Sequence, residues 1–324
     1  MGSKDTLTKN YLKRPEIFAD AFNYFLFGGE KVIKPKDLKE EDPTEIAVMR
    51  KMGKAFPSQK MRDVLRRCTI RRSKYATLVL LGIEGQSDVS YIMPVRDYLY
   101  DALNYADQVE AIRKKHAETN DLKGAEFISG FSKKDRIVPV ITLCVCFDKK
   151  HWDGPRSLYD MFGKIDPRIK KYVNDYTLNL ITPDEIEDFT RFSSELGIAM
   201  EFINISDDKK KLRDIIESRE DYKSVDVSTI DIINTYTSAN ISKKQAEGGR
   251  VNMCTAIQGL IEDGKIEGRR EGRREGRREG REEGENMAFK LLKLLTPGTK
   301  DYDKALNGTT AERKRLYKKY KIID

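Results

Sequence analysis

Two apolar runs in the first half of the chain constrain its fold more than any other feature. Leu78–Ile83 is continuously apolar, and Val138–Phe147 is nearly so. Runs of this length are typical of strands covered on both faces, so we predict strands over Tyr75–Ile83 and Arg136–Phe147. Between them, Met93–Lys115 has the residue spacing of a long helix. This order of elements predicts an α/β layered fold.

Further elements are expected on the N-terminal side of these strands. Pro15–Phe27 has the apolar spacing of a helix, with proline in its first turn and Gly28-Gly29 to end it. Met61–Ile70 is predicted as a strand despite its arginines, and a short helix is predicted near Glu45–Met52.

The long helix predicted over residues 93–115 carries two different rows of side chains. Its apolar stripe comprises Val95, Leu99, Ala102, Leu103, Ala106, Val109 and Ile112. A polar row at a spacing of four lies beside it and comprises Arg96, Tyr100, Asn104 and Gln108. An apolar stripe normally faces the core of a protein.

The second half of the chain is more polar. Residues 183 to about 260 have a helical pattern, and Glu-Gly-Arg-Arg then occurs three times in succession from Glu267. Each glycine disfavours a helix by about 1 kcal/mol, whereas Glu–Arg pairs return only a few tenths. We therefore predict a core over 1–160, a helical accessory region over 161–260, a solvated and partly helical linker over 261–286, and a basic helical tail over 287–324.

Composition excludes several classes of protein. No apolar run approaches the roughly 20 residues needed to cross a bilayer, and residues 1–14 lack the apolar segment expected of a secretory signal. The four cysteines are too few and too scattered for a disulfide framework. Cys144 and Cys146 share one strand face, where buried packing is a better interpretation than zinc binding because the chain has only two histidines.

The net charge of +8 is concentrated near the N-terminus. The first 75 residues hold 18 Lys or Arg against 10 Asp or Glu, and the rest of the chain holds 43 of each sign. Residues 51–74 contain nine basic residues, and Asp63 is the only acid among them. A basic segment of this density attracts phosphate backbones or anionic lipid, although a solvated surface is the usual alternative.

Two carboxylates are expected to meet at one end of the predicted sheet. Asp63 lies in the first of two neighbouring strands, and Glu84 and Gln86 stand on one face at the end of the second. If these strands pair antiparallel, Asp63 reaches the same end of the sheet as Glu84. Two carboxylates in this position suit a hard cation such as Mg²⁺, although an acid at a strand end is more often a solvated turn residue.

The order of a helix with an acid, then Asp63, then Glu84-x-Gln86 and another helix resembles the PD-(D/E)xK nuclease superfamily. More closely, residues 80–86 (LLGIEGQ), followed by residues 93–96 (MPVR) and Tyr100, resemble the Rpn or YhgA-like family of recombination-promoting nucleases and transposase-like proteins. Residues 152–155 (WDGP) and the Glu-Gly-Arg-rich tail are also similar to that family. The resemblance covers residues 15–160 well and the remainder loosely.

The resemblance implies a restriction-endonuclease-like core, with a mixed central sheet flanked by helices. It also implies that Asp63 and Glu84 bind Mg²⁺ (or Mn²⁺), with Asp20 as a weaker candidate for a further ligand from the first helix. Gln86 occupies the position at which the superfamily usually has lysine, and it can orient a water molecule but carries no charge.

The same resemblance assigns candidate phosphate contacts. Arg96 and Tyr100 match the helix that follows the motif, where phosphate binding and packing against the sheet are equally good interpretations. The contacts expected from the basic segment are Arg66, Arg67, Arg71 and Arg72.

Two hypotheses follow. The first is a Mg²⁺-dependent DNA endonuclease that acts in recombination or transposition, in the cytoplasm and associated with the nucleoid. The second is a protein that keeps the nuclease fold and binds nucleic acid or serves assembly, with weak or no catalysis. DNA is the expected partner in either case, a membrane is not, and a homo-oligomer is left open.

Overall fold

The computed structural model describes residues 3–41, 63–72, 75–244 and 246–323. Its contacts divide the chain into two compact units, Met1–Ala256 and Ile257–Asp324. The border between the units lies close to the start of α11 (Met253–Leu294). The border predicted at residue 160 falls inside the first unit.

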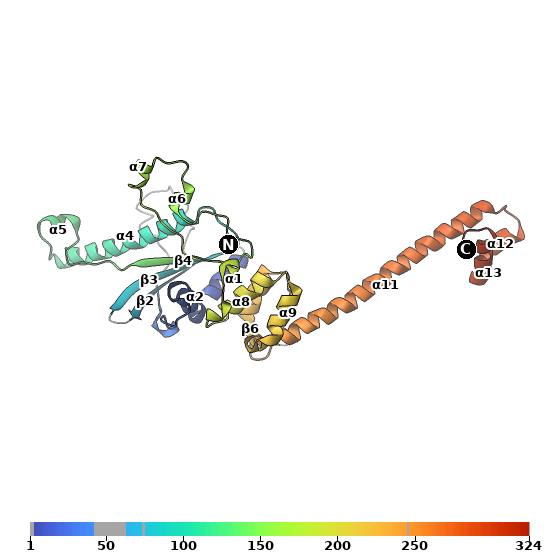
Figure 1. The fold of residues 1–324 in the computed structure, drawn as a ribbon, viewed down its shortest axis with the longest axis horizontal. Coiled ribbons are helices and arrows are strands. Elements are labelled where there is room, and N and C mark those ends of the chain that lie inside the picture. The colour runs from blue at the N-terminus through green and yellow to red at the C-terminus, as the bar shows by residue number, and fades with distance from the viewer. Residues whose placement is uncertain (1–2, 42–62, 73–74, 245, 324) are drawn as a thin grey trace. The chain divides into compact units, whose positions relative to one another are not determined.

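A mixed five-stranded sheet forms the centre of the first unit, with the strand order β1-β2-β3-β4-β5 (Figure 1). The strands are β1 (Lys39–Glu40), β2 (Val64–Arg72), β3 (Tyr75–Gln86), β4 (Val140–Cys146) and β5 (Leu180–Ile181). β1, β2 and β3 pair antiparallel, whereas β3, β4 and β5 run parallel. The predicted mixed α/β fold is confirmed, as is the antiparallel pairing of β2 with β3, the strands next to Asp63 and Glu84.

Helices cover both faces of this sheet. α4 (Met93–Thr119) packs on one face, and α1 (Ser3–Leu12) packs on the other beside α10 (Val227–Tyr236). The remaining helices of the unit are α2 (Pro15–Phe27), α5 (Gly124–Ser129), α6 (Leu158–Met161), α7 (Pro167–Lys170), α8 (Leu196–Ile205) and α9 (Lys209–Ser218). Short elements are the strand pair β6 (Val225–Asp226) and β7 (Arg250–Val251), with 3₁₀ turns η1 (Pro35–Asp37), η2 (Pro183–Glu185), η3 (Phe189–Arg191) and η4 (Glu220–Lys223).

Local sequence signals placed several boundaries correctly. α2 has the predicted bounds, because Pro15 is in its first turn and Gly28 ends it in the left-handed conformation, with φ of +62°. The Gly28 amide donates to the carbonyl of Tyr24 at 3.0 Å. β4 begins four residues later than predicted, and the short helix predicted near residues 45–52 lies outside the described residues.

The helix α4 turns its polar row, not its apolar stripe, toward the sheet. Its buried residues are Met93, Pro94, Asp97, Tyr100, Asp101, Leu103 and Asn104. Leu103 is the only buried member of the predicted stripe, and Val95 is 46% exposed. The polar row can be buried because it is hydrogen-bonded: the Gln108 side chain donates to the Val138 carbonyl at 3.1 Å and accepts from the Val138 amide at 2.6 Å.

The two strand cysteines pack in the core as predicted. Cys144 and Cys146 form a buried cluster with Met93, Trp152 and Leu178 on the α4 side of the sheet. All four cysteines are free thiols.

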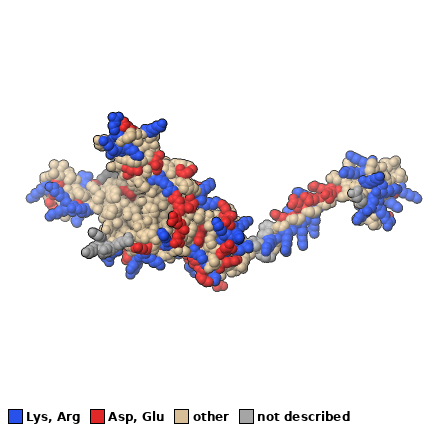
Figure 2. Space-filling model, in the orientation of Figure 1, with Lys and Arg blue, Asp and Glu red and all other residues tan. Residues whose placement is uncertain are grey.

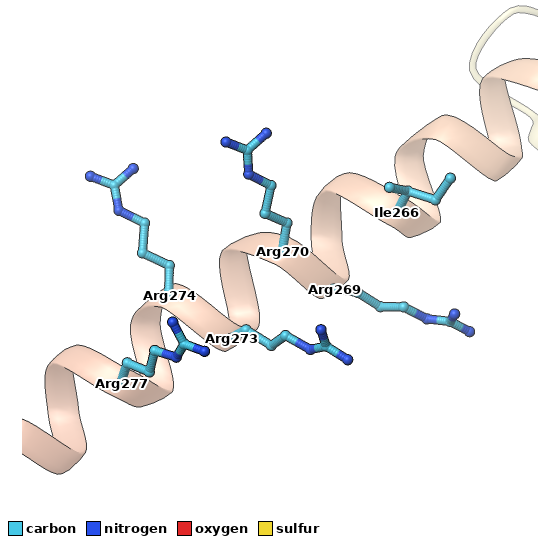
Figure 3. A pocket seen from close by; sticks show the side chains of 6 residues that line it. All are labelled: Ile266, Arg269, Arg270, Arg273, Arg274 and Arg277. Atoms are coloured by element: carbon cyan, nitrogen blue, oxygen red, sulfur yellow. The ribbon is translucent and has the colours of Figure 1, made fainter.

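In the second unit, the Glu-Gly-Arg-Arg repeat is helical throughout rather than partly helical, because α11 continues without a break from residue 253 to 294. A repeat of four residues places each residue type in a row along the helix, and Glu meets Arg at a spacing of three, as in Glu275 and Arg278, whose Oε1 and Nη2 atoms lie 3.9 Å apart. Just after the repeat, the Arg281 Nε lies 2.9 Å from Glu285 Oε1 at a spacing of four. Figure 3 shows the arginine rows, which flank a shallow hollow beside Ile266.

A small separate core ends the second unit. Leu291 of α11 and Leu295, which follows it, pack with Leu316 of α13 (Thr310–Lys319), and the partly buried Tyr302 of α12 (Lys300–Asn307) packs against them. Thr309 and Glu312 form a capping box that begins α13. The helical C-terminal region predicted from the sequence is confirmed.

We expect Gly272→Ala and Gly276→Ala each to stabilise α11 by about 1 kcal/mol, because glycine in a helix carries a conformational entropy cost. A Cβ atom at either position meets no atom within 4 Å. Slower amide hydrogen exchange across residues 265–285 would show the gain. Gly28→Ala is the matched control: a Cβ there also meets nothing, but φ of +62° strains alanine, so this change should lower the melting temperature. Unchanged exchange in both helix variants would contradict the expectation.

Candidate functional site

The ends of β2 and β3 bring Asp63 and Glu84 together. Val64 pairs with Ile83, so Asp63 comes directly opposite Glu84 in the antiparallel register. The Asp63 amide donates to Glu84 Oε1 at 3.2 Å, and the Gly85 amide donates to Asp63 Oδ2 at 2.9 Å. Each of the two carboxyl groups therefore accepts a hydrogen bond from a backbone amide of the opposite chain segment, at one end of the sheet.

Glu84 is buried and paired with a cation from α4. Its side chain is 4% exposed, and Glu84 Oε2 lies 2.9 Å from Arg96 Nη2. Burial lowers the pKa of Arg96, but the charge of Glu84 raises it, and the net shift is upward. The Arg96 Nε is buried and has no hydrogen-bond partner among the described residues. The Nη2 atom of this guanidinium thus binds Glu84, and its Nε–H group is a donor that can bind another acceptor.

Asp63 is half-buried, and its electrostatics differ from those of a surface acid. Burial raises the pKa of Asp63, and the hydrogen bond from Gly85 acts in the opposite direction. The charges of Lys9 and Arg96 also lower this pKa. Asp63 thus lies in a partly desolvated position, and nearby cations favour its charged, carboxylate form.

Glycine at position 85 allows α1 to approach the site closely. A Cβ atom there would lie 2.7 Å from Thr8 Cγ2 and 2.9 Å from Leu12 Cδ1 of α1. Either distance is a clash, so a larger residue would require the side chains of Thr8 or Leu12 to move. The short sequence Glu84-Gly85-Gln86 therefore combines a site carboxylate with a tight packing point.

Gln86 follows on the same strand. Its side-chain amide donates to the backbone carbonyl of Gly85 at 3.1 Å. The backbone carbonyl of Gln86 accepts from the backbone amide of Phe147 at 2.9 Å. The side chain is partly exposed. A neutral amide in this position can orient a water molecule or a phosphate oxygen, but it adds no charge.

Asp20, a predicted metal ligand, has a different set of partners. Its carboxylate is 2% exposed and accepts hydrogen bonds from the amides and hydroxyls of Ser193 and Ser194, just before α8. Among the described residues, the ligand atoms of Asp20, Asp63 and Glu84 do not form a group in which all three lie within 4.8 Å of one another. The structure brings Asp63 to Glu84 but ties Asp20 to the start of α8.

The basic segment divides between the two faces of β2. Arg66 is 3% exposed, donates to the Lys13 carbonyl at 2.6 Å, and lies 5.3 Å from the centre of the Phe18 ring. This burial argues against the predicted phosphate contact. Arg67 and Arg71 are exposed on the opposite face, and Arg67 is paired with Glu41 at 2.8 Å. The Arg72 side chain and residues 51–62 lie outside the described part of the chain.

A buried polar cluster beside the site was not predicted. Asp101 accepts from the Thr142 hydroxyl at 2.5 Å and from the Tyr176 hydroxyl at 2.7 Å, and these two contacts connect α4, β4 and the segment before β5. Tyr100 is 1% exposed, which favours the packing interpretation over phosphate binding. The signal in the sequence was the spacing of Asp97, Tyr100 and Asp101, which places all three on the sheet side of one helix.

The two histidines are bound to other acids. His116 lies between Asp121 and Asp135, with ring nitrogens 2.7 and 2.8 Å from their carboxylates. His151 Nδ1 lies 2.7 Å from Asp184, and with Glu185 these side chains form the only group of three within 4.8 Å that the described residues contain. Glu185 is itself paired with Arg156, so existing ion pairs account for this group.

His116 should make the junction of α4 and α5 sensitive to pH. Hydrogen bonds to Asp121 and then Asp135 raise the pKa of His116, and the pKa values of both aspartates are lowered. A raised pKa in the folded state means that this stabilisation is complete below about 6.5 and is lost as pH rises through the raised value. Hydrogen exchange of residues 121–135, corrected for intrinsic rates, should accelerate between pH 6 and 9. The dependence should vanish in His116→Gln, and equal slopes in both proteins would contradict it.

Comparison with protein-family models, with curated proteins and with solved structures found no match for this chain. In the part of the chain that the structure describes, no helix has the length and apolar character needed to cross a membrane. The function must therefore be argued from the geometry of the site.

Proposed function

We propose that this protein is a metal-dependent DNA endonuclease with a core of the PD-(D/E)xK type. The observation that carries the proposal is the pair formed by Asp63 and Glu84, which comes from neighbouring strand ends and is joined by the Asp63 amide at 3.2 Å. The resemblance in sequence assigns the metal ligands to the same two residues. The geometry and the resemblance are independent arguments that favour one site.

The donor set fits Mg²⁺ or Mn²⁺. These ions take carboxylate oxygens and keep several waters, so one or two carboxylates and the substrate phosphate are enough. Asp63 and Glu84 would hold the ion. When bound, such an ion lowers the pKa of a coordinated water and stabilises charge on a phosphate. Asp20 is left out of this ligand set because its oxygens are occupied by the two serines.

The chain's own residues would position the substrate. The buried Arg96 Nε belongs to the guanidinium that contacts Glu84 and has no hydrogen-bond partner among the described residues, and a phosphate oxygen is a suitable acceptor for it. Arg67 and Arg71 lie exposed on β2, where they can contact the backbone of the DNA. Gln86 would orient a water molecule through its amide.

A second candidate function is nucleic-acid binding without efficient cleavage. The observation that favours it is the ion pair between Arg96 and Glu84 at 2.9 Å, because a guanidinium on the carboxylate competes with a metal ion. The neutral Gln86 points in the same direction. Under this alternative, Arg96 and the exposed arginines bind phosphate while the site remains unreactive.

Nicking of supercoiled plasmid by the full-length chain separates the two functions. The endonuclease proposal expects open-circular or linear product in Mg²⁺ and in Mn²⁺, and intact plasmid in EDTA. Binding of the same plasmid in EDTA, measured by gel shift, is the control. Binding with no cleavage in either metal would favour the second function. If the protein neither binds nor cleaves the plasmid, both proposed functions are contradicted.

A further inference from the structure

The segment between α4 and β4 forms an exposed tip, defined here as residues 120–136. It contains α5 and lies beyond the C-terminal end of α4 (Figure 1). Phe127 is 64% exposed and Ile128 is 83% exposed at its surface. Two adjacent apolar side chains with this exposure form an apolar patch on the surface of the tip.

The tip is held in one conformation by its own acids. Asp121 and Asp135 bind His116 from both sides, as described above. Glu126 accepts from the Lys133 amide at 2.9 Å, and the Gly130 amide closes the C-terminal end of α5. A Cβ atom at Gly130 would lie 2.9 Å from Arg113, so α4 and the tip are closely packed. Phe127 and Ile128 therefore lie on a segment whose conformation is stabilised by these contacts.

The acids of the tip bind His116 or backbone amides of the tip itself, whereas its cations are exposed. Lys123, Lys133, Lys134 and Arg136 are all exposed, and none of them forms an ion pair within the described residues. Figure 2 shows Lys and Arg gathered over this end of the first unit. An exposed apolar pair and four cations without ion pairs, all within one short segment, are complementary to a polyanion that has apolar interior surfaces.

We propose that the tip contacts duplex DNA, with Phe127 and Ile128 inserted between base steps and the exposed cations of the tip on the phosphates. Proteins that kink DNA use apolar wedges of this kind and repay the unstacking with backbone contacts. This inference rests on the proposed function in that the same partner is DNA, but it concerns a surface outside the Asp63–Glu84 pair.

The shape of the tip favours DNA over a membrane surface. An interfacial helix buries an apolar face along several turns, whereas α5 has six residues and offers two adjacent apolar side chains. A wedge needs only one or two side chains. Four cations within 14 residues also suit the dense charge of a phosphate backbone.

The test uses the full-length chain in EDTA, so that cleavage cannot occur, and a 20-base-pair duplex with 2-aminopurine at its centre. Binding of the wild-type protein should raise the 2-aminopurine fluorescence several-fold, because the base is unstacked. Phe127→Ala together with Ile128→Ala should remove the rise and leave the salt dependence of binding unchanged. Ile169→Ala on α7 is the matched control, since that side chain is 57% exposed.

The phosphate contacts are tested separately. Lys133→Gln together with Lys134→Gln should reduce the slope of log K against log salt by up to about 1.8. Lys209→Gln with Lys210→Gln, two adjacent exposed lysines on α9, should leave the slope unchanged. A fluorescence rise that persists in the Phe127/Ile128 variant would overturn the proposal, as would Phe127-dependent capture by anionic vesicles with no effect on DNA.

Failure of this inference is distinguishable from failure of the proposed function. Unstacking in EDTA without cleavage in Mg²⁺ would support the wedge and overturn the endonuclease. Cleavage in Mg²⁺ without Phe127-dependent unstacking would overturn the wedge and leave the endonuclease in place.

Discussion

Glu84→Gln is expected to reduce DNA cleavage by at least about 100-fold while DNA binding survives. Removal of residues that only support a metal ligand already costs 10- to 100-fold in many metalloenzymes, and Glu84 is proposed as a ligand itself. Glutamine keeps the size of the side chain and its ability to accept from the Asp63 amide. DNA binding should be equal or tighter, because a negative charge near the phosphates is removed. Single-turnover nicking in Mg²⁺, with binding followed in Ca²⁺, measures both effects.

The control for this variant is Glu185→Gln, an acid of the His151 group outside the proposed site. It should cleave at the wild-type rate. Because Glu84 is paired with Arg96, loss of its charge also affects folding, so the melting temperature of each variant must be measured alongside. Full cleavage by a folded Glu84→Gln protein would contradict the assignment of Glu84.

Asp20→Ala should lower the free energy of unfolding by about 3–5 kcal/mol. The buried Asp20 carboxylate accepts from both amides and both hydroxyls of Ser193 and Ser194. Alanine leaves these donors without their acceptor, and hydrogen bonds to a charged group contribute about 1.5–3 kcal/mol each in favourable cases, not additively. Urea unfolding of the full-length protein would measure the loss.

Asp207→Ala is a suitable control, because this acid is 80% exposed in its pair with Lys149 and should change stability by less than about 1 kcal/mol. Asp20→Asn should fall between the two, since an amide keeps one acceptor. A stable Asp20→Ala protein that has lost only cleavage would instead restore Asp20 to the metal site.

The sequence predicted the pairing of Asp63 with Glu84 because that pairing depends on local rules. A strand alternates its side chains, and antiparallel neighbours place residues opposite one another by register. The end of β3 extends to Gln86, so the motif lies within the strand. The bounds of α2 followed from proline and glycine, whose backbone preferences are also local.

Features that depend on long-range partners were not predictable in this way. The stripe of α4 was expected to be buried on hydropathy, but the buried face contains Asp97, Asp101 and Asn104. The partners of Asp101 come from β4 and from the segment before β5. The burial of Arg66 depends on the Lys13 carbonyl and the Phe18 ring, which no periodicity reveals. Glu84 likewise meets Arg96 only because α4 returns over the sheet.

The helical repeat in α11 shows a further limit. Glycine propensities counted one by one predicted a partial helix, whereas the four-residue period brings a Glu and an Arg together at a spacing of three in each successive repeat. Cooperative helix formation adds these contributions over many residues, and α11 is also joined to a packed core at Leu291 and Leu295.

Counting of bound Mn²⁺ by electron paramagnetic resonance, in the presence of a short duplex with a non-hydrolysable phosphate at the cleavage position, tests the central claim most directly. The account predicts that the wild-type chain binds at least one Mn²⁺ that is lost in Asp63→Asn and in Glu84→Gln. The control Asp184→Asn, which alters the His151 group, should retain that ion. Equal Mn²⁺ binding by the wild-type chain and by both site variants would contradict the account.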